Sequence, residues 1–447
     1  MTDCTTEPLV FSRLHRQQVV ADFAGGTLTS DSGLLLLREV NRRTGLIPAI
    51  AEALADPRDP ARITHELQTL LAQRIFGIAA GYEDLNDQQT LRHDPLLAVL
   101  AEQRPDPEQP LASPPTLCRL ENAIDRASFG RFAAVFVEQF IASQTPPPAE
   151  LILDFDATDA RLHGNQEGRF FHGYYGDYCY LPLYVFAGDQ LLAAYLRPSN
   201  IDAARHSRAI LKLLVTRLRQ AWPAVKIVFR ADSGFCRWKR LRWCDRHDVQ
   251  YVIGLAKNSV LEGLLAESMQ QAARQFEQTG HKQRLFTEFA YAAGTWDQPR
   301  RVIGKAEHAS QGANPRFLVT NRPDDPQELY DKVYCQRGEM ENRIKEQQLD
   351  LFADRVSCQK FQANQFRLLL SAAAYVLVES LRRLVLAQTE LAQAQAGTIR
   401  LKLFKVAARV VVSVRRVVLH LASSYPLSDL FGQILRRLQT LPATPSG

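Results

Sequence analysis

Three acidic residues occupy positions, after expected strands or within an expected helix, at which a carboxylate could bind a metal ion. Asp156 follows an apolar run in LILDFDATDARLHG, Asp232 follows a β-branched run in KIVFRADSGFCR, and Glu341 lies inside VYCQRGEMENRIKEQQ. Two strand-end aspartates and one helical glutamate could hold two Mg²⁺ or Mn²⁺ ions, because these hard cations prefer oxygen ligands. Such a pair of ions would activate a water or a 3′-hydroxyl group and stabilise the leaving oxygen of in-line phosphoryl transfer.

The helix expected around Glu341 carries further functional groups on one side. Four residues with spacings of three, four and four share a helical stripe about 80° wide: Tyr334, Arg337, Glu341 and Lys345. A phenol, two cations and a carboxylate on one face suit a phosphate-binding surface with a metal ligand at its centre. A surface ladder of ion pairs would have the same spacing, and it is the simpler explanation.

The aspartates also have simpler explanations. A single acid at a strand end is often only a helix cap or a turn residue. Asp154 lies one pleat period before Asp156, on the same face of the expected strand, so the spacing leaves the choice of first acid open.

The elements that must position these acids follow an alternating pattern. Strands are expected at residues 151–155, 180–186, 191–196, 225–229 and 249–255, with helices at 204–221 and 237–247. This order predicts a mixed α/β sheet whose first strands form hairpins and whose later strands are joined by crossovers. Chemistry in such sheets collects at the carboxyl ends of the strands. Short alternating runs within residues 283–320 indicate a β-rich insertion before the Glu341 helix.

The rest of the chain is expected to be mainly helical. Helices are predicted at residues 33–44, 62–79, 116–143, 326–347 and 362–392. The length of 447 residues favours two or three domains. A membrane protein is not expected, because no run of about eighteen apolar residues occurs. Seven scattered cysteines without a Cys-x-x-Cys pair argue against disulfides and structural zinc, and fit a reducing, cytoplasmic compartment.

The net charge of +6 is concentrated near the C-terminus. Residues 399–437 contain eight basic residues and one acid, a balance of +7, so the rest of the chain sums to −1. The basic residues are Arg400, Lys402, Lys405, Arg409, Arg415, Arg416, Arg436 and Arg437. Such a concentration favours a polyanion partner, nucleic acid above all, although a solvated basic face is the alternative.

The ordered set of motifs resembles the group 1 DDE transposases of bacterial insertion sequences. Besides the two aspartate elements and Tyr-x-x-Arg-x-x-x-Glu, the similar stretches are FAGGTLTSDSGLLLLREV, GYEDLNDQQTLRHDP, HGNQEGRFFHGYYGDYCYLPLYVF, LRPSNIDA and YCQRGEMENRIKEQQLDLFADRVS. The resemblance covers most of the chain. It implies a ribonuclease H-like catalytic domain interrupted by a β-strand insertion.

The resemblance also implies roles for particular residues. Asp156, Asp232 and Glu341 would be the catalytic, metal-holding acids, with Tyr334 and Arg337 on the phosphates of the transposon end. The family usually has a lysine seven residues after the glutamate, where this chain has Gln348. Lys345 lies on the same helical face as the glutamate and could substitute for the missing lysine.

Trp296 has two candidate roles. In related transposases an aromatic residue of the insertion stacks on a base flipped from a DNA hairpin, which offsets part of the cost of flipping. The alternative is a core position in the β-rich segment.

Five regions are therefore expected. They are a mostly helical DNA-end-binding region (1–148), the catalytic domain in two parts (149–260 and 326–395), its β-rich insertion (261–325) and a basic C-terminal region (396–447). The implied activity is Mg²⁺-dependent cleavage at transposon ends and strand transfer into target DNA. The expected partners are double-stranded DNA, at terminal inverted repeats and target, and a second copy of the chain in the synaptic complex. A nuclease without strand transfer and an inactive, domesticated DNA-binding protein are the alternatives.

Overall fold

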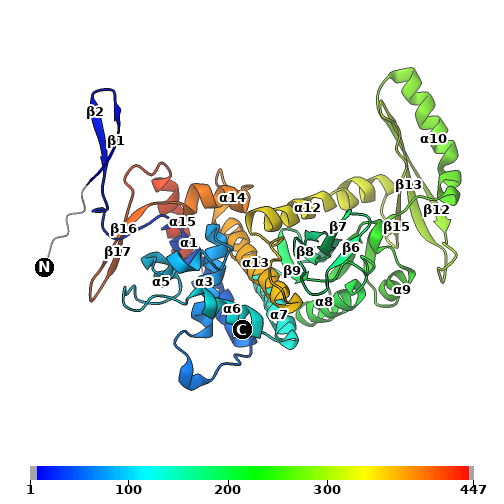
Figure 1. Cartoon of the computed structure of the whole chain (residues 1–447). Helices are drawn as coiled ribbons and strands as arrows, with labels where there is room; N and C mark the ends of the chain where they lie inside the picture. Colours follow the sequence, from blue (N-terminus) through cyan, green and yellow to red (C-terminus); the bar gives the residue numbers. More distant parts are fainter. Residues whose placement is uncertain (1–7, 442–447) are drawn as a thin grey trace. The chain divides into compact units, whose positions relative to one another are not determined.

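The protein folds into two compact units (Figure 1). The structure, a computed structural model, describes residues 8–441, so residues 1–7 and 442–447 of the predicted end regions lie outside it. The first unit comprises the described parts of residues 1–43, 58–120 and 380–442, and the second comprises residues 44–57 and 121–379. Each unit thus joins segments that are far apart in the sequence.

The second unit is built on a nine-stranded mixed sheet with the order β12-β13-β15-β11-β10-β4-β8-β9, in which β14 also pairs with β13. Its strands are β4 (Glu150–Ala157), β8 (Leu183–Ala187), β9 (Gln190–Tyr195), β10 (Lys226–Ala231), β11 (Gln250–Leu255), β12 (Gln283–Tyr291), β13 (Arg300–Ala309), β14 (Gly312–Ala313) and β15 (Arg316–Thr320). A small separate sheet contains β5 (Ala160–Arg161), β6 (Phe170–His172) and β7 (Asp177–Tyr180).

The order of five strands confirms the predicted ribonuclease H-like sheet. β4, β8 and β9 form an antiparallel meander, and β10 and β11 follow in parallel on the other side of β4. Counted along the chain, these five strands have the spatial order 3-2-1-4-5. The crossovers that make parallel pairing possible are α8 (Ser207–Ala221) and α9 (Trp238–Arg246).

The two faces of this sheet have different roles. Leu153, Phe155 and Phe229 belong to the main hydrophobic core, which also includes residues of α7 (Arg126–Ser143), α8 and α9. Because side chains alternate along a strand, Asp154 and Asp156 lie on the opposite face. That face packs against residues of the helical stretch that contains the predicted Glu341 helix.

This helical stretch alternates between α-helical and π-helical segments. It contains α11 (Pro326–Glu328), a π-helical segment (Leu329–Tyr334), α12 (Arg337–Lys345) and a second π-helical segment (Glu346–Asp350). α13 (Phe361–Leu381) follows. π-helical turns often occur at functional sites, and here they flank the helix that carries Glu341.

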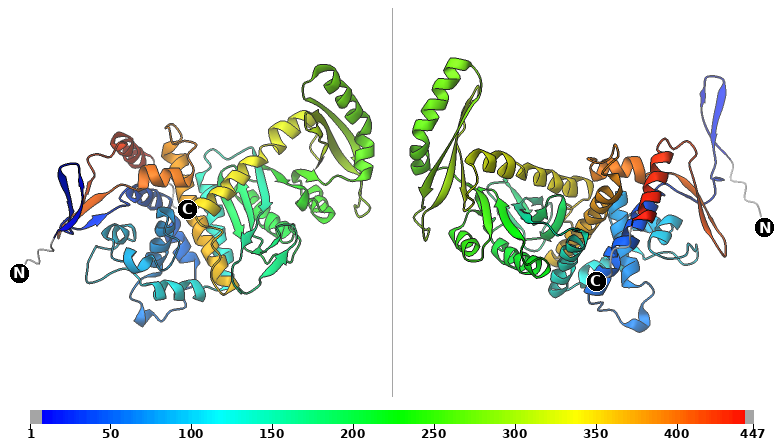
Figure 2. Two further views of the ribbon diagram at one scale, coloured as in Figure 1. Left: turned by 45° about the horizontal axis from the view of Figure 1, so that its top comes forward. Right: turned by 180° about the vertical axis from the view of Figure 1, so that it is seen from behind.

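The segment predicted as a β-rich insertion contains a helix as well as strands. It begins with a long helix, α10 (Ser259–Thr279), and its strands β15, β13 and β12 continue the central sheet beyond β11. α10 lies along β12 and β13 in all three views (Figures 1 and 2). Gly304 permits this close packing, since a Cβ atom there would lie 2.7 Å from the Leu265 side chain.

The first unit is mainly helical, as predicted, but carries two β-hairpins. Its helices are α1 (Leu34–Thr44), α3 (Leu67–Ala80), α4 (Gln88–Leu91), α5 (Pro95–Leu100), α6 (Pro114–Ala123), α14 (Ala396–Ile399) and α15 (Ser428–Thr440). β1 (Leu9–Leu14) pairs with β2 (Gln17–Ala21), while β3 (Leu28–Thr29), β16 (Ala408–Val412) and β17 (Val417–Leu421) form a three-stranded sheet. A short helix, α2 (Leu46–Ala53), belongs to the second unit.

One predicted helix is divided in two. The helix expected over residues 116–143 consists of α6 and α7, because the Asp125 carboxylate accepts a hydrogen bond from the Ser128 backbone N–H and caps a new helix. Within the described part of the chain, no helix combines the length and hydropathy needed to cross a bilayer.

Candidate active site

Two aspartates lie side by side where neighbouring parallel strands end. β4 and β10 pair with Phe155 in register with Ala231. Asp156 and Asp232 are the next residues along the two strands, so the register brings them together at the carboxyl edge of the sheet. The structure thus joins two acids that are far apart in the sequence.

Glu341 is linked to this pair through an arginine. Arg337 Nη1 lies 3.1 Å from Asp156 Oδ2, and Arg337 Nη2 lies 2.5 Å from Glu341 Oε1. One turn of α12 separates the arginine from the glutamate, so both side chains point toward the end of β4. The stripe predicted from residue spacing therefore includes a cation that bridges two of the three acids.

The electrostatics of Asp156 reflect the crowding of acids. Burial raises the pKa of the Asp156 carboxyl to about 6, the Arg337 guanidinium opposes this rise, and the carboxylates of Asp232 and Glu341 add to it. A bound cation would lower this pKa by stabilising the ionised form. The ionised Asp156 carboxylate would therefore be stabilised by a bound metal ion.

Asp154 has a different environment from Asp156. It is in register with Arg230 across β4 and β10, and the two side chains form a bidentate ion pair with exposed fractions of only 3% and 7%. Arg230 also donates a hydrogen bond to the Val333 carbonyl. Both oxygens of Asp154 are thus used inside the fold, which favours Asp156 as the first acid. Sequence reasoning missed Arg230, although it lies only two residues before Asp232.

Asp232 has an oxygen that lacks a protein partner. Its Oδ1 atom is buried and receives no hydrogen bond from the residues that the structure describes. The hydroxyl of Tyr334 lies close by, over Gly254, where a Cβ atom would be 2.6 Å from the hydroxyl and 2.9 Å from the Ser233 nitrogen. Burial raises the pKa of Tyr334, Arg337 opposes this, and Asp232 adds to it. Gly254 is a site residue that no sequence signal revealed.

The donor set suits a divalent cation, although it is not assembled around one. Three carboxylates, one of which has a buried oxygen without a protein partner, match the oxygen ligands of Mg²⁺ and Mn²⁺. Within residues 8–441, however, no three His, Cys, Asp or Glu side chains are grouped closely enough to hold a metal. The Arg337 guanidinium between Asp156 and Glu341 accounts for this separation.

Gln348, which stands at the family's lysine position, has a structural contact. Its side-chain amide donates a 2.9 Å hydrogen bond to the Asp159 carbonyl, in the turn that follows β4. Both residues line a polar cavity of about 420 Å³, together with Arg161 and His163. Lys345 is exposed and forms no ion pair among residues 8–441. The substitution of Lys345 for the missing lysine stays a prediction.

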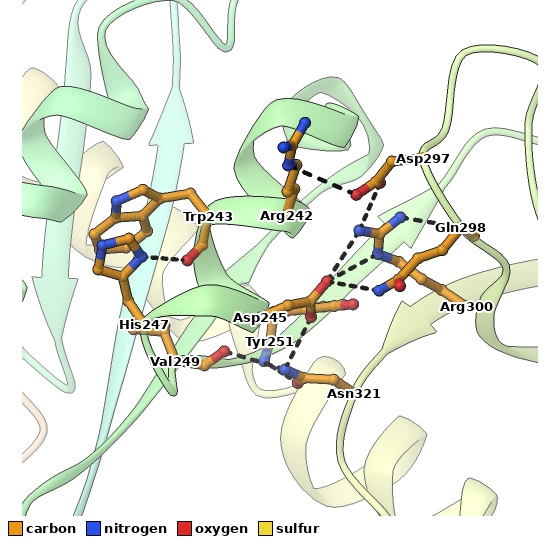
Figure 3. Close-up of polar contacts among 10 residues, drawn as sticks. All are labelled: Arg242, Trp243, Asp245, His247, Val249, Tyr251, Asp297, Gln298, Arg300 and Asn321. Carbon is orange, nitrogen blue, oxygen red and sulfur yellow. Dashed lines mark hydrogen bonds and ion pairs between the residues drawn. The ribbon is translucent and has the colours of Figure 1, made fainter.

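Trp296 has packing partners in the insertion. It is partly buried against the main core, its ring centroid is 5.5 Å from that of Tyr291, and the Arg300 guanidinium lies 5.6 Å from it. Its neighbour Asp297 and Arg300 belong to a polar network with Asp245 of α9, which fixes the loop between β12 and β13 (Figure 3). These contacts favour the packing role, and the base-stacking role stays a prediction.

The basic residues of the C-terminal stretch fall into two groups. Lys405 pairs with Asp31 at 2.5 Å and lies 4.3 Å above the ring of Tyr82, while Arg400 donates to the Ala79 carbonyl. These two cations thus serve contacts within the first unit. The exposed residues of the set are Lys402, Arg409, Arg415, Arg416 and Arg436.

Comparison with known proteins assigns the family. Residues 11–443 match the family model described as transposase DDE domain group 1, so the chain belongs to this family, and the resemblance seen in its motifs is confirmed. Among solved structures, the chain is similar to a piggyBac transposase in a synaptic complex with hairpin DNA, determined by cryo-EM. The identity is 11% and the TM-score 0.40, with 79% of this chain and 76% of that chain covered. No curated protein matches the sequence.

Proposed function

We propose that this transposase catalyses divalent-metal-dependent cleavage at the ends of an insertion sequence and strand transfer into target DNA, by cut-and-paste transposition. Asp156, Asp232 and Glu341 would hold two Mg²⁺ or Mn²⁺ ions. The observation that carries the proposal is the convergence of these acids: Asp156 and Asp232 lie on adjacent strand ends, and Glu341 is joined to Asp156 through Arg337.

The residues around the acids would position a DNA strand. Arg337 contacts carboxylates, and a phosphate diester offers its guanidinium the same paired oxygen acceptors. A phosphate that draws Arg337 away would leave Asp156 and Glu341 free for metal ions. Tyr334 presents its hydroxyl beside Asp232 and could donate to the same phosphate. Bound ions would activate the attacking oxygen and stabilise the leaving oxygen.

The reaction also needs two transposon ends at once. We expect the working complex to contain double-stranded DNA with terminal inverted repeats and at least two copies of the chain. Bound DNA would be cleaved and joined in the same site, because both steps are in-line attacks on a phosphodiester, by water in hydrolysis and by a 3′-hydroxyl group in strand transfer.

The test uses purified full-length protein and a plasmid that carries the DNA flanking the gene on both sides. With Mg²⁺, the wild-type protein should release the flanked segment and join it to a second plasmid. Asp156→Ala, Asp232→Ala and Glu341→Ala should each reduce cleavage by at least about 10³-fold, since each removes a charged ligand. Glu339→Gln is the matched control, because this exposed acid lies on the same helix and should leave cleavage unchanged.

The products separate the proposal from its two rivals. Cleavage without joined product would identify a nuclease that lacks strand transfer. Binding without cleavage by the wild-type protein would identify an inactive DNA-binding protein. Retained cleavage in the Asp156 variant would show that the first acid lies elsewhere.

A further inference from the structure

Two β-hairpins of the first unit are exposed to an unusual extent. Every residue of β1 and β2 is exposed, and so are the turn and the outer face of β16 and β17. Both hairpins project from the helices of the unit in each view (Figures 1 and 2). A two-stranded hairpin is at best marginally stable by itself in water, so contact with a partner would stabilise these arms.

The two hairpins share a common base. The chain leaves β2 at Ala21 and enters β3 at Leu28, and β3 pairs with the first strand of the second hairpin. The Val410 backbone N–H also donates a 2.8 Å hydrogen bond to the Thr27 carbonyl. Segments from the two ends of the sequence are therefore joined into one pair of arms.

The charge of both arms has one sign. Residues 9–21 and 408–421 contain no Asp or Glu, and their five arginines are Arg13, Arg16, Arg409, Arg415 and Arg416. All five are exposed, and none forms an ion pair with another residue of the described chain. Two histidines, His15 and His420, lie on the same arms.

The tips of the arms have a similar design. In the first, the two-residue turn His15–Arg16 follows Leu14, whose exposed fraction is 58%. In the second, hydrogen bonds between Ser413 and Arg416 close a turn that presents Val414, which is 91% exposed. Each tip thus offers an apolar side chain next to arginines.

We infer that these two hairpins are arms that grip duplex DNA. The five arginines would contact phosphates, and Leu14 and Val414 would enter a groove. A two-stranded ribbon fits the major groove, and apolar side chains at such positions pack against base edges. The inference rests on the proposed function for the choice of DNA as polyanion, and it assigns binding to residues remote in sequence from the catalytic acids.

The charge of the hairpins favours DNA over a second copy of the chain as their binding partner. Packing one arm against its own copy would bring arginines together without any acid to neutralise them. Contact with phosphates instead neutralises them and releases counterions from the DNA. Exposed apolar residues also run along the strands of both hairpins, and those at the tips, Leu14 and Val414, lie beside arginines that can hold them against DNA.

The test measures binding of full-length protein to a fluorescein-labelled, random-sequence duplex by anisotropy across a salt series with EDTA. EDTA prevents cleavage, so the result is independent of the proposed chemistry. Arg415→Gln with Arg416→Gln, and separately Arg13→Gln with Arg16→Gln, should each lower the slope of log affinity against log salt by about two. Each pair should also weaken binding at least about tenfold at moderate salt. The corresponding lysine variants should retain the slope.

Leu14→Gln with Val414→Gln should weaken binding severalfold without changing the salt slope. Arg62→Gln and Leu213→Gln, at other exposed positions, are the matched controls and should bind like the wild type. Unchanged slopes in both arginine variants would overturn the inference. Loss of a dimer in sedimentation with unchanged DNA affinity would also overturn it and assign the arms to self-association. If the arginine variants lower the slope as expected but the wild-type protein does not cleave DNA, the result would contradict the proposed function alone.

Discussion

Asp154 and Arg230 form a bidentate ion pair across two parallel strands, directly below the residues that we assign to catalysis. Asp154 and Asp156 lie on the same face of β4, yet only Asp154 has its charge neutralised by a buried partner in this way. The pair therefore distinguishes the two acids of the strand: Asp154 is used inside the fold, and Asp156 is left for the proposed catalytic role. It also supports the strand that presents Asp156.

The first prediction concerns stability. Asp154→Asn should lower the free energy of unfolding by about 3–5 kcal/mol, because it leaves the buried Arg230 charge without a partner. Asp156→Asn should not lower it, since burial and, to a smaller extent, the neighbouring acids disfavour the ionised form of that carboxyl. Urea denaturation measures both. The double variant Asp154→Leu with Arg230→Met should cost less than the Asp154 variant alone, and an additive result would contradict the proposed coupling.

The sequence predicted the sheet and its acids better than it predicted their local partners. Short apolar runs separated by helical patterns are sufficient to define β4, β10 and β11, and strand-end positions locate Asp156 and Asp232. The choice between Asp154 and Asp156 depended on Arg230, whose contact is set by the register of two strands 76 residues apart. Residue spacing contains no information about that register.

The insertion and the arms were harder to predict for a related reason. The strands of the insertion have the same alternation whether they form a separate module or extend the sheet, and only pairing with β11 decides this. The basic C-terminal residues were recognised as a group, but Lys405 pairs with Asp31, far away in the sequence. Long-range contacts thus separate the structural cations from the exposed ones.

The second prediction concerns pH. Glu307 forms ion pairs with Lys282 and Lys305 and accepts a hydrogen bond from Asn314. Burial raises the pKa of its carboxyl group, but these three partners outweigh burial and lower the pKa from 4.5 to about 2. The resulting stability is therefore present above about pH 4.5 and is lost as the pH falls toward 2. Glu307→Gln should lower stability by about 1–3 kcal/mol at neutral pH. Thermal unfolding at several pH values should show the difference shrinking below pH 4.5, and a constant difference would contradict the assignment.

The third prediction concerns Gly254. A methyl group there would overlap the Tyr334 hydroxyl and the Ser233 backbone, so Gly254→Ala should displace the turn that holds Asp232. We expect cleavage to fall by at least about 10²-fold, because small displacements of catalytic groups have large effects on rate. Tyr334→Phe added to Gly254→Ala should restore part of the cleavage by removing the overlapping oxygen. Gly263→Ala, in α10 with open space around it, is the control and should leave cleavage unchanged.

The fourth prediction concerns Lys405 and Lys402, which differ in environment despite their proximity in sequence. Lys405→Met should lower the free energy of unfolding by about 3 kcal/mol, since Asp31 is nearly buried and would lose its cation. Lys402→Met should leave stability unchanged, because Lys402 is exposed. Denaturation of the two variants in parallel measures the contrast. Equal stabilities would show that Lys405 is not a structural cation.

The last prediction concerns the two roles of Arg337. Because its guanidinium contacts Asp156 and Glu341, it would compete with the proposed metal ions for the same carboxylates. Arg337→Gln removes two charge-assisted hydrogen bonds worth about 1.5–3 kcal/mol each, so Mn²⁺ should bind at least about tenfold more tightly to the variant without DNA. Cleavage should nevertheless fall, because the same arginine is proposed to hold the phosphate of the transposon end. Calorimetric titration with Mn²⁺ and the plasmid assay measure the two effects separately. If the variant bound Mn²⁺ more weakly than the wild type, Arg337 would support the metal site rather than compete with it.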